Sequence, residues 1–245
     1  MSYDFALAWR ILPELLQGTA VTLAVVALPL VFGMLISVPI TLARLSSNPV
    51  LVSAAWSFTT VFRGAPALVV VYLIYYGAPT LGFVRNTILW AVFSEPYYCA
   101  VIGLTLNHAG FLTEVIRGAL QAVPHNLIEA AKSLGLTRRL VFVKITVPLA
   151  IRYGLSAYLN EIILFVKGTA IVGAITVTDL LAVANETVST TYDLITPLVS
   201  AAVIYWVLVQ ILRAIFIRLE RHLSQHLDLD GGTRDDRGSS IGRSL

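Results

Sequence analysis

The chain has 245 residues, of which 57% are hydrophobic and 13% are charged. Ordinary soluble domains carry about 25% charged residues, so this composition argues against a soluble globular protein and favours a membrane protein. The formal net charge is only +3, and a single cysteine, Cys99, excludes an internal disulfide framework. A helix that crosses a bilayer needs about 20 apolar residues, so the chain has room for about five spans in one membrane domain.

Residues 1–18 are predicted to form an interfacial lead-in on the periplasmic side of the membrane. This segment contains acidic residues, including Glu14, and lacks the cationic start of a secretory signal, so we expect it to be retained. Trp9 favours the level of the lipid headgroups. The uncharged run that follows predicts a first span over residues 19–43.

The second and third spans are interrupted or flanked by charged residues. The second is predicted over residues 66–82 with some preceding helix, which places Arg63 near a membrane face. The third is predicted over residues 97–120. Within it, Glu114 and Arg117 are three residues apart and therefore neighbours on a helix, so we expect them to form an ion pair.

A polar, charged segment at residues 121–146 separates the third and fourth spans. Within it, Leu127, Ala131 and Leu134 recur at helical spacing and so line one side of a short helix. Gly135 permits the left-handed turn that ends such a helix. A short exposed helix of this kind is marginal alone in water, which predicts that it docks into a groove of a partner.

The fourth span is predicted over residues 147–171 and the fifth over residues 194–217, with a loop at 176–193 between them. The membrane domain as a whole therefore extends over residues 19–227. The remaining residues, 228–245, are rich in Asp, Gly, Arg and Ser, which predicts a disordered cytoplasmic tail.

The basic residues predict the orientation of the spans, because Lys and Arg favour the cytoplasmic side of a membrane protein. We expect the N-terminus outside and the C-terminus inside, so that the segment at 121–146 is cytoplasmic. In this orientation the inner loops and flanks hold most of the basic residues, namely Arg44, Arg117, Lys132, Arg138, Arg139, Lys144, Arg152, Arg218 and Arg221.

Two ionisable residues in the fourth span, Glu161 and Lys167, are the first candidates for substrate contacts, because charges inside a span usually face the protein interior or a wet cavity. They are six residues apart, so on a regular helix they lie about 9 Å apart along the axis and point in directions that differ by about 120°. Both would face one cavity only if the helix were distorted. Gly168 and Thr169 are candidates for such a break.

In such a site, Lys167 and Thr169 would hold a carboxylate of a ligand. Glu161, together with Asn160, would accept a cationic group of the same ligand through charge-assisted hydrogen bonds. Asn107 in the third span is a weaker candidate for substrate binding. The alternative is that Glu161 and Lys167 pair with each other, or with a partner subunit, and do not touch the substrate.

The chain contains no recognisable motif for hydrolysis. It has no Gly-x-x-x-x-Gly-Lys-Ser/Thr loop, so ATP and Mg²⁺, if they drive transport, must bind to a different polypeptide. Gly-x-Ser-x-Gly, His-Glu-x-x-His and clusters of metal ligands are also missing from the sequence. We therefore expect a membrane protein without a cofactor of its own, rather than an enzyme.

The segment from Glu129 to Pro148 resembles a known signature. It reads Glu-Ala-Ala, three residues, Gly135, nine residues and then Ile-Thr-Val-Pro. This is similar to the cytoplasmic-loop motif of the permease subunits of ABC importers, in which Leu stands where this chain has Val147. In that family the loop forms a coupling helix that docks on the ATP-hydrolysing subunit. The resemblance implies a type I importer permease fold, with coupling contacts from Glu129, Ala130, Ala131, Lys132, Leu134 and Gly135.

Three stretches resemble the polar amino acid permeases, which import histidine, lysine, arginine, ornithine and opines. Residues 62–66, 130–135 and 160–164 read Phe-Arg-Gly-Ala-Pro, Ala-Ala-Lys-Ser-Leu-Gly and Asn-Glu-Ile-Ile-Leu. The resemblance implies a subunit of an ATP-driven importer in a bacterial inner membrane, with basic amino acids or opines as substrates. It also implies a second permease subunit, paralogous or identical, two ATP-binding subunits and a periplasmic amino-acid-binding protein. Nucleic acid is not an expected partner.

An ion-coupled secondary amino acid carrier is the alternative function. Such carriers usually show internal repeats and more spans. Neither is visible in this sequence.

Overall fold

The computed structural model describes residues 3–225, with side chains as far as residue 218, and all of its regular elements are helices. Four helices are long and apolar enough to cross a membrane, and there are five spans if one bent helix pair counts as a span. The predicted all-α fold with five spans is therefore confirmed. The predicted tail at 228–245 lies outside the described residues.

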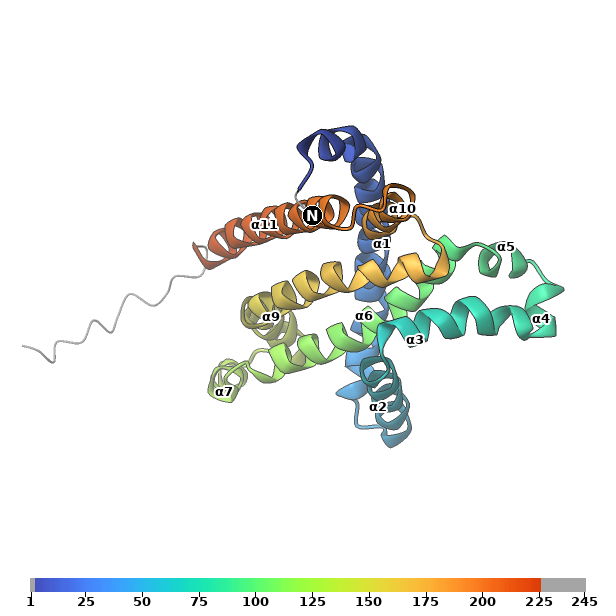
Figure 1. The fold of residues 1–245 in the computed structure, drawn as a ribbon. Helices are drawn as coiled ribbons and strands as arrows, with labels where there is room; N and C mark the ends of the chain where they lie inside the picture. The colour runs from blue at the N-terminus through green and yellow to red at the C-terminus, as the bar shows by residue number, and fades with distance from the viewer. Residues whose placement is uncertain (1–2, 226–245) are drawn as a thin grey trace, which may run out of the picture.

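Helix α1 (Phe5–Arg44) is 40 residues long and starts well before the predicted first span. The side chain of Asp4 caps it by accepting hydrogen bonds from the backbone N–H groups of Ala6 and Leu7. The segment expected to be a separate lead-in is therefore continuous with the first span. Figure 1 shows the dark blue start of α1 at an angle to the rest of the helix. Pro13, which removes one helical hydrogen bond, lies within this start.

The second span is bent. The helix expected before it is present, but it meets the span at a sharp angle. Helix α2 (Pro49–Gly64) ends before Pro66, and α3 (Ala67–Tyr72) leaves at an angle of 105°. The cause is Pro66, because it has no backbone N–H to continue the helix and disfavours helical geometry in the residue before it. After α3 the chain continues through a π-helical turn (Leu73–Gly77) and a 3₁₀ turn (Ala78–Thr80).

Two short helices, α4 (Gly82–Arg85) and α5 (Trp90–Phe93), connect this span to the central helix α6 (Pro96–Gln121). Helix α6 packs against α1, α2, α3 and the later helix α9 (Val147–Gly168) (Figure 1). Small residues allow these close approaches: a Cβ atom at Gly33 of α1 would lie 2.5 Å from the His108 ring of α6.

The ion pair expected in the third span is confirmed. Arg117 Nη2 lies 2.6 Å from Glu114 Oε2. Arg44, at the end of α1, also joins this carboxylate, with Nη2 3.3 Å from Oε1. The pair therefore ties the end of α1 to the second half of α6.

After α6, helix α7 (His125–Ser133) and the short α8 (Arg138–Val141) lead through a π-helical turn (Phe142–Thr146) into α9 (Val147–Gly168). A 3₁₀ segment (Thr169–Ile175) follows α9. Together α8, the turn, α9 and this segment form one candidate span from Arg138 to Ile175.

The loop expected at 176–193 contains a helix instead, α10 (Leu180–Thr191), followed by α11 (Ile195–Gln225). Thr176, with φ of 65°, turns the chain, and Asp179 caps α10 by accepting a hydrogen bond from the Ala182 N–H at 2.9 Å. Helix α10 packs against α1 and α11. The main apolar core lies between α1, α3, α6 and α9 and includes Val25, Val71, Leu104 and Val166.

Candidate functional site

The first candidate site is the surface around helix α7. A glycine-based cap ends this helix: Gly135, with φ of +83°, donates to the Lys132 carbonyl, and Leu136 donates to the Ala131 carbonyl. At Gly135 the positive φ favours glycine, because a Cβ atom would be strained in this backbone conformation. The expected helix and its predicted end are therefore both present.

The side chains of α7 divide into a buried and an exposed set. Ala131 is buried, whereas Leu127 is 43% exposed and Leu134, just after the helix, is 83% exposed. The other residues of the expected coupling set, Glu129, Ala130 and Lys132, are exposed. Ala131 thus lies on the packed side of α7, and the two leucines lie at the surface.

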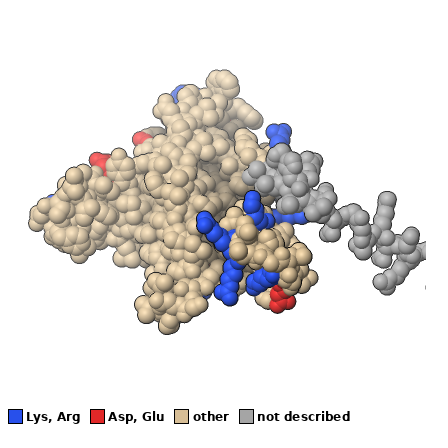
Figure 2. Space-filling view, turned by 180° about the vertical axis from the view of Figure 1, so that it is seen from behind, with Lys and Arg blue, Asp and Glu red and all other residues tan. Residues whose placement is uncertain are grey.

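Exposed basic residues lie on α7 and on the segments that follow it, and we call them the basic cluster. They are Lys132, Arg138, Arg139, Lys144 and Arg152. Figure 2 shows Lys and Arg gathered on one part of the surface, with few on the rest of that face. Glu129 lies 3.1 Å from the Nδ1 atom of His125 on the same helix. This surface combines two apolar side chains with positive charge, which suits a partner that offers an apolar groove with acidic residues.

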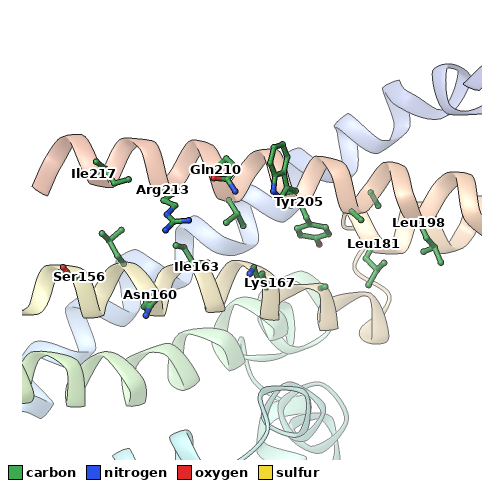
Figure 3. A pocket seen from close by; sticks show the side chains of 16 residues that line it. Ser156, Asn160, Ile163, Lys167, Leu181, Leu198, Tyr205, Gln210, Arg213 and Ile217 are labelled. Atoms are coloured by element: carbon green, nitrogen blue, oxygen red, sulfur yellow. The ribbon is translucent and has the colours of Figure 1, made fainter. Parts of the chain in front are cut away.

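The second candidate site is a groove between α9 and α11 with a volume of about 860 Å³. Figure 3 shows Asn160 and Lys167 of α9 on one wall and Tyr205, Gln210 and Arg213 of α11 on the other. None of the 16 residues that line it is acidic. With two cations, two amides and otherwise mostly apolar walls, the groove favours an anionic group such as a carboxylate.

Lys167 makes no hydrogen bond or ion pair with the residues that the structure describes. Its ammonium group is therefore available to a ligand. Asn160 lies seven residues earlier on the same helix, which places it about 10 Å along the groove from Lys167. The groove thus offers polar groups at two separated positions.

Glu161 lies on a different side of α9. Its Oε1 atom is 3.8 Å from Nδ1 of His108 on α6, and within residues 3–218 it forms no ion pair with Lys167. The expected break does not bring the two residues together, because α9 is regular as far as Gly168 and the 3₁₀ segment starts only after Lys167. The separation of about 120° that a regular helix imposes is therefore retained.

Asn107 and Thr169 both have partners within the chain. Asn107 is buried and donates from Nδ2 to the Phe62 carbonyl at 2.8 Å. Thr169 is buried and donates from its hydroxyl to the Val166 carbonyl at 2.8 Å. Neither lines the groove, so their assignment to the substrate stays a prediction.

Sequence reasoning missed His108 as the neighbour of Glu161. Its ring is fully buried, packs 4.8 Å from the Phe165 ring, and has no hydrogen-bond partner among the described residues. It also missed Arg213, because the pairing of α9 with α11 is a long-range contact. For His108, the available signal was the pair of adjacent polar residues at 107–108 in an apolar span. For Arg213, it was a basic residue within an apolar helix.

Comparisons with known proteins agree with this architecture. Residues 30–225 match the family model described as "Binding-protein-dependent transport system inner membrane component". The chain is 35% identical to the nopaline transport system permease protein NocM of Agrobacterium fabrum, over 91% of this chain and 93% of that protein. It is 38% identical to the histidine/lysine/arginine/ornithine transport system permease protein HisM of Salmonella typhimurium, over 86% of this chain and 90% of that protein.

Solved structures agree as well. A chain of a crystallised amino acid ABC transporter with histidines is 32% identical, with a TM-score of 0.81 and coverage of 91% of this chain and 100% of that one. The MetNI methionine ABC transporter in an inward-facing conformation, at 23% identity and a TM-score of 0.73, shares the fold. These neighbours confirm the ABC importer permease fold. With the family model matching most of its length, the chain belongs to the inner membrane components of binding-protein-dependent transport systems.

Proposed function

We propose that this permease imports amino acids of the basic or opine class, powered by ATP that separate subunits hydrolyse. The relatives named for nopaline, octopine and histidine/lysine/arginine/ornithine transport, at 34–38% identity over most of the chain, support this substrate class. The observation that carries the ATP-driven mechanism is helix α7, where Leu127 and Leu134 are exposed and the basic cluster begins. A secondary carrier needs no such docking surface.

We further propose that the N-terminus lies outside and that α7 is cytoplasmic, in a bacterial inner membrane. The basic cluster supports this orientation, since Lys and Arg favour the cytoplasmic side. Two ATP-binding subunits would dock there, and ATP and Mg²⁺ would bind to them. A second permease subunit, paralogous in our proposal, would complete the pathway, and a periplasmic binding protein would deliver the substrate.

The groove between α9 and α11 is the proposed carboxylate site on this chain. Lys167 has no partner among the described residues, so its ammonium group can bind a carboxylate by a charge-assisted hydrogen bond. Arg213 on the opposite wall adds to the positive charge of the groove. Asn160 and Gln210 add neutral amides on the two walls. We propose that Glu161, whose carboxylate lies near His108, supports the packing of α9 against α6. Its contribution to the cationic end of the site comes from the side of α9 that faces His108, not from the groove.

Transport by the reconstituted complex tests the proposal. Proteoliposomes that contain the complete complex should accumulate labelled arginine or an opine only with ATP and binding protein, and loaded binding protein should raise the rate of ATP hydrolysis. Unlabelled competitors define the substrate class. Uptake by this chain alone, driven by a sodium or proton gradient without ATP, would instead establish an ion-coupled carrier.

A further inference from the structure

A second cavity lies where the end of α1 meets α2 and α6, and we call it the α2 junction cavity. Its volume is about 340 Å³. It is lined by Arg44, Trp56, Thr59, Thr60, Arg63, Gly64, Phe111 and Glu114. It is separate from the groove between α9 and α11, with which it shares no lining residue.

Positive charge exceeds negative charge around the α2 junction cavity. Both carboxylate oxygens of Glu114 are engaged: Oε1 accepts from Arg44 at 3.3 Å, and Oε2 accepts from Arg117 Nε at 2.7 Å. Arg63 has no carboxylate partner among the described residues, and its guanidinium carbon lies 5.6 Å from the centre of the Phe111 ring. The cavity lining therefore holds the guanidinium groups of Arg44 and Arg63 and the carboxylate of Glu114, an excess of one positive charge. Arg117, which is not among the lining residues, also pairs with this carboxylate.

The available donors match a phosphate group. A guanidinium presents N–H donors in a planar fork that fits two oxygens of a phosphate, and charge-assisted bonds of this kind are strong. Arg63 keeps its whole fork free of protein acceptors, and Arg44 and the Thr60 hydroxyl line the same cavity. Glu114 also lines the cavity, but the two arginines that it binds offset its charge.

The surroundings of the cavity indicate where the phosphate comes from. Side chains of α1 and α2 near it are large and apolar, with Leu42 52% exposed, Trp56 53% exposed and Val61 58% exposed. Acyl chains can cover such a surface, and Trp favours the level of lipid headgroups. Inorganic phosphate would satisfy the arginines and leave the apolar surface uncovered. We propose that the α2 junction cavity binds the phosphate of an anionic phospholipid, with Arg63 as its main ligand.

Lipid binding by the purified transporter complex tests this inference. Delipidated complex in detergent is titrated with short-chain phosphatidylglycerol, short-chain phosphatidylcholine or inorganic phosphate, and binding is followed by native mass spectrometry and by the shift in Tm. Arg63→Gln should weaken phosphatidylglycerol binding by about tenfold or more, as expected when a hydrogen bond to a charged group is lost. Arg63→Lys keeps the positive charge but loses the planar fork of donors. Its affinity for phosphatidylglycerol should therefore lie between that of the unaltered protein and that of Arg63→Gln.

The matched control is Arg85→Gln, because Arg85 also lies over an aromatic ring, 5.8 Å from the centre of Trp90, outside the cavity. It should bind phosphatidylglycerol like the unaltered protein. Gly64→Leu keeps all the arginines and adds a side chain where no atom lies within 4 Å, so it should also weaken binding by filling the cavity. Unchanged phosphatidylglycerol binding in Arg63→Gln or Gly64→Leu would overturn the site. If inorganic phosphate binds and shifts the Tm as much as phosphatidylglycerol does, a lipid would be ruled out as the source of the bound phosphate.

Discussion

Replacement of Asn107 with leucine should destabilise the bend between α2 and α3. The Asn107 amide donates to the Phe62 carbonyl at 2.8 Å. In an uninterrupted helix this carbonyl would accept from the backbone N–H of residue 66, but residue 66 is proline and has no N–H. Asn107 therefore provides the hydrogen bond that the bend removes.

The size of the effect follows from the burial of this hydrogen bond. Asn107 is only 7% exposed, and the bond that it makes is part-buried. Leucine keeps a branched side chain and removes the donor, which leaves the Phe62 carbonyl without this partner. Such a loss costs about 1–3 kcal/mol. For a chain of this length, on the scale known for soluble proteins, that corresponds to a fall in Tm of about 2–12 °C.

Thermal unfolding of the detergent-solubilised complex, with uptake measured on the same preparation, checks this prediction. Asn160→Leu is the matched control, because Asn160 is exposed in the groove and should lose little stability. At a temperature well below its Tm, Asn107→Leu should retain the unaltered substrate preference. An unchanged Tm combined with a raised KM for uptake would refute the structural role and return Asn107 to the substrate site.

Three further predictions concern other parts of the chain. Gly135→Ala strains the left-handed turn after α7 by about 1–2 kcal/mol and should lower ATPase stimulation by loaded binding protein, whereas Gly168→Ala, at a position with open space and negative φ, should not. Lys167→Met should raise the KM for uptake about tenfold or more while basal ATP hydrolysis is retained, because one charge-assisted bond to the carboxylate is lost; an unchanged KM would remove Lys167 from the site. Burial raises the pKa of the Asp179 carboxyl above the ordinary 3.8, so the folded state binds this proton more readily than the unfolded chain. Relative to Asp179→Asn, the unaltered protein should therefore gain stability as the pH falls from 7 toward about 4, and parallel pH profiles of Tm would contradict this.

Features that depend on local spacing were predicted correctly from the sequence. The ion pair of Glu114 and Arg117 needs only neighbouring positions on one helix, and the end of α7 at Gly135 needs only a residue that tolerates positive φ. The number of spans follows from long apolar runs. Each of these depends on residues close together in the chain.

Features that depend on tertiary packing were not predictable. The early start of α1 and the presence of α10 both depend on a cap and on helix packing. The sequence did not reveal these caps, because Asp4 and Asp179 look like ordinary loop acids in it. The neighbour of Glu161 is His108, 53 positions away in the chain. Helical geometry alone could show that Lys167 does not share a face of the helix with Glu161, but it could not identify the histidine.

Helix α9 links the two candidate sites in a way that neither site shows alone. It follows α8 and one π-helical turn, and it then runs for 22 residues, or about 33 Å, without a break. Its start carries Arg152 of the basic cluster, and its end carries Lys167 in the groove. A regular helix of this length can move as one body, so we propose that a displacement imposed on α7 and α8 by a docked partner reaches the groove through α9. In this proposal, the regular geometry that keeps Glu161 away from Lys167 is also the property that lets α9 transmit the motion.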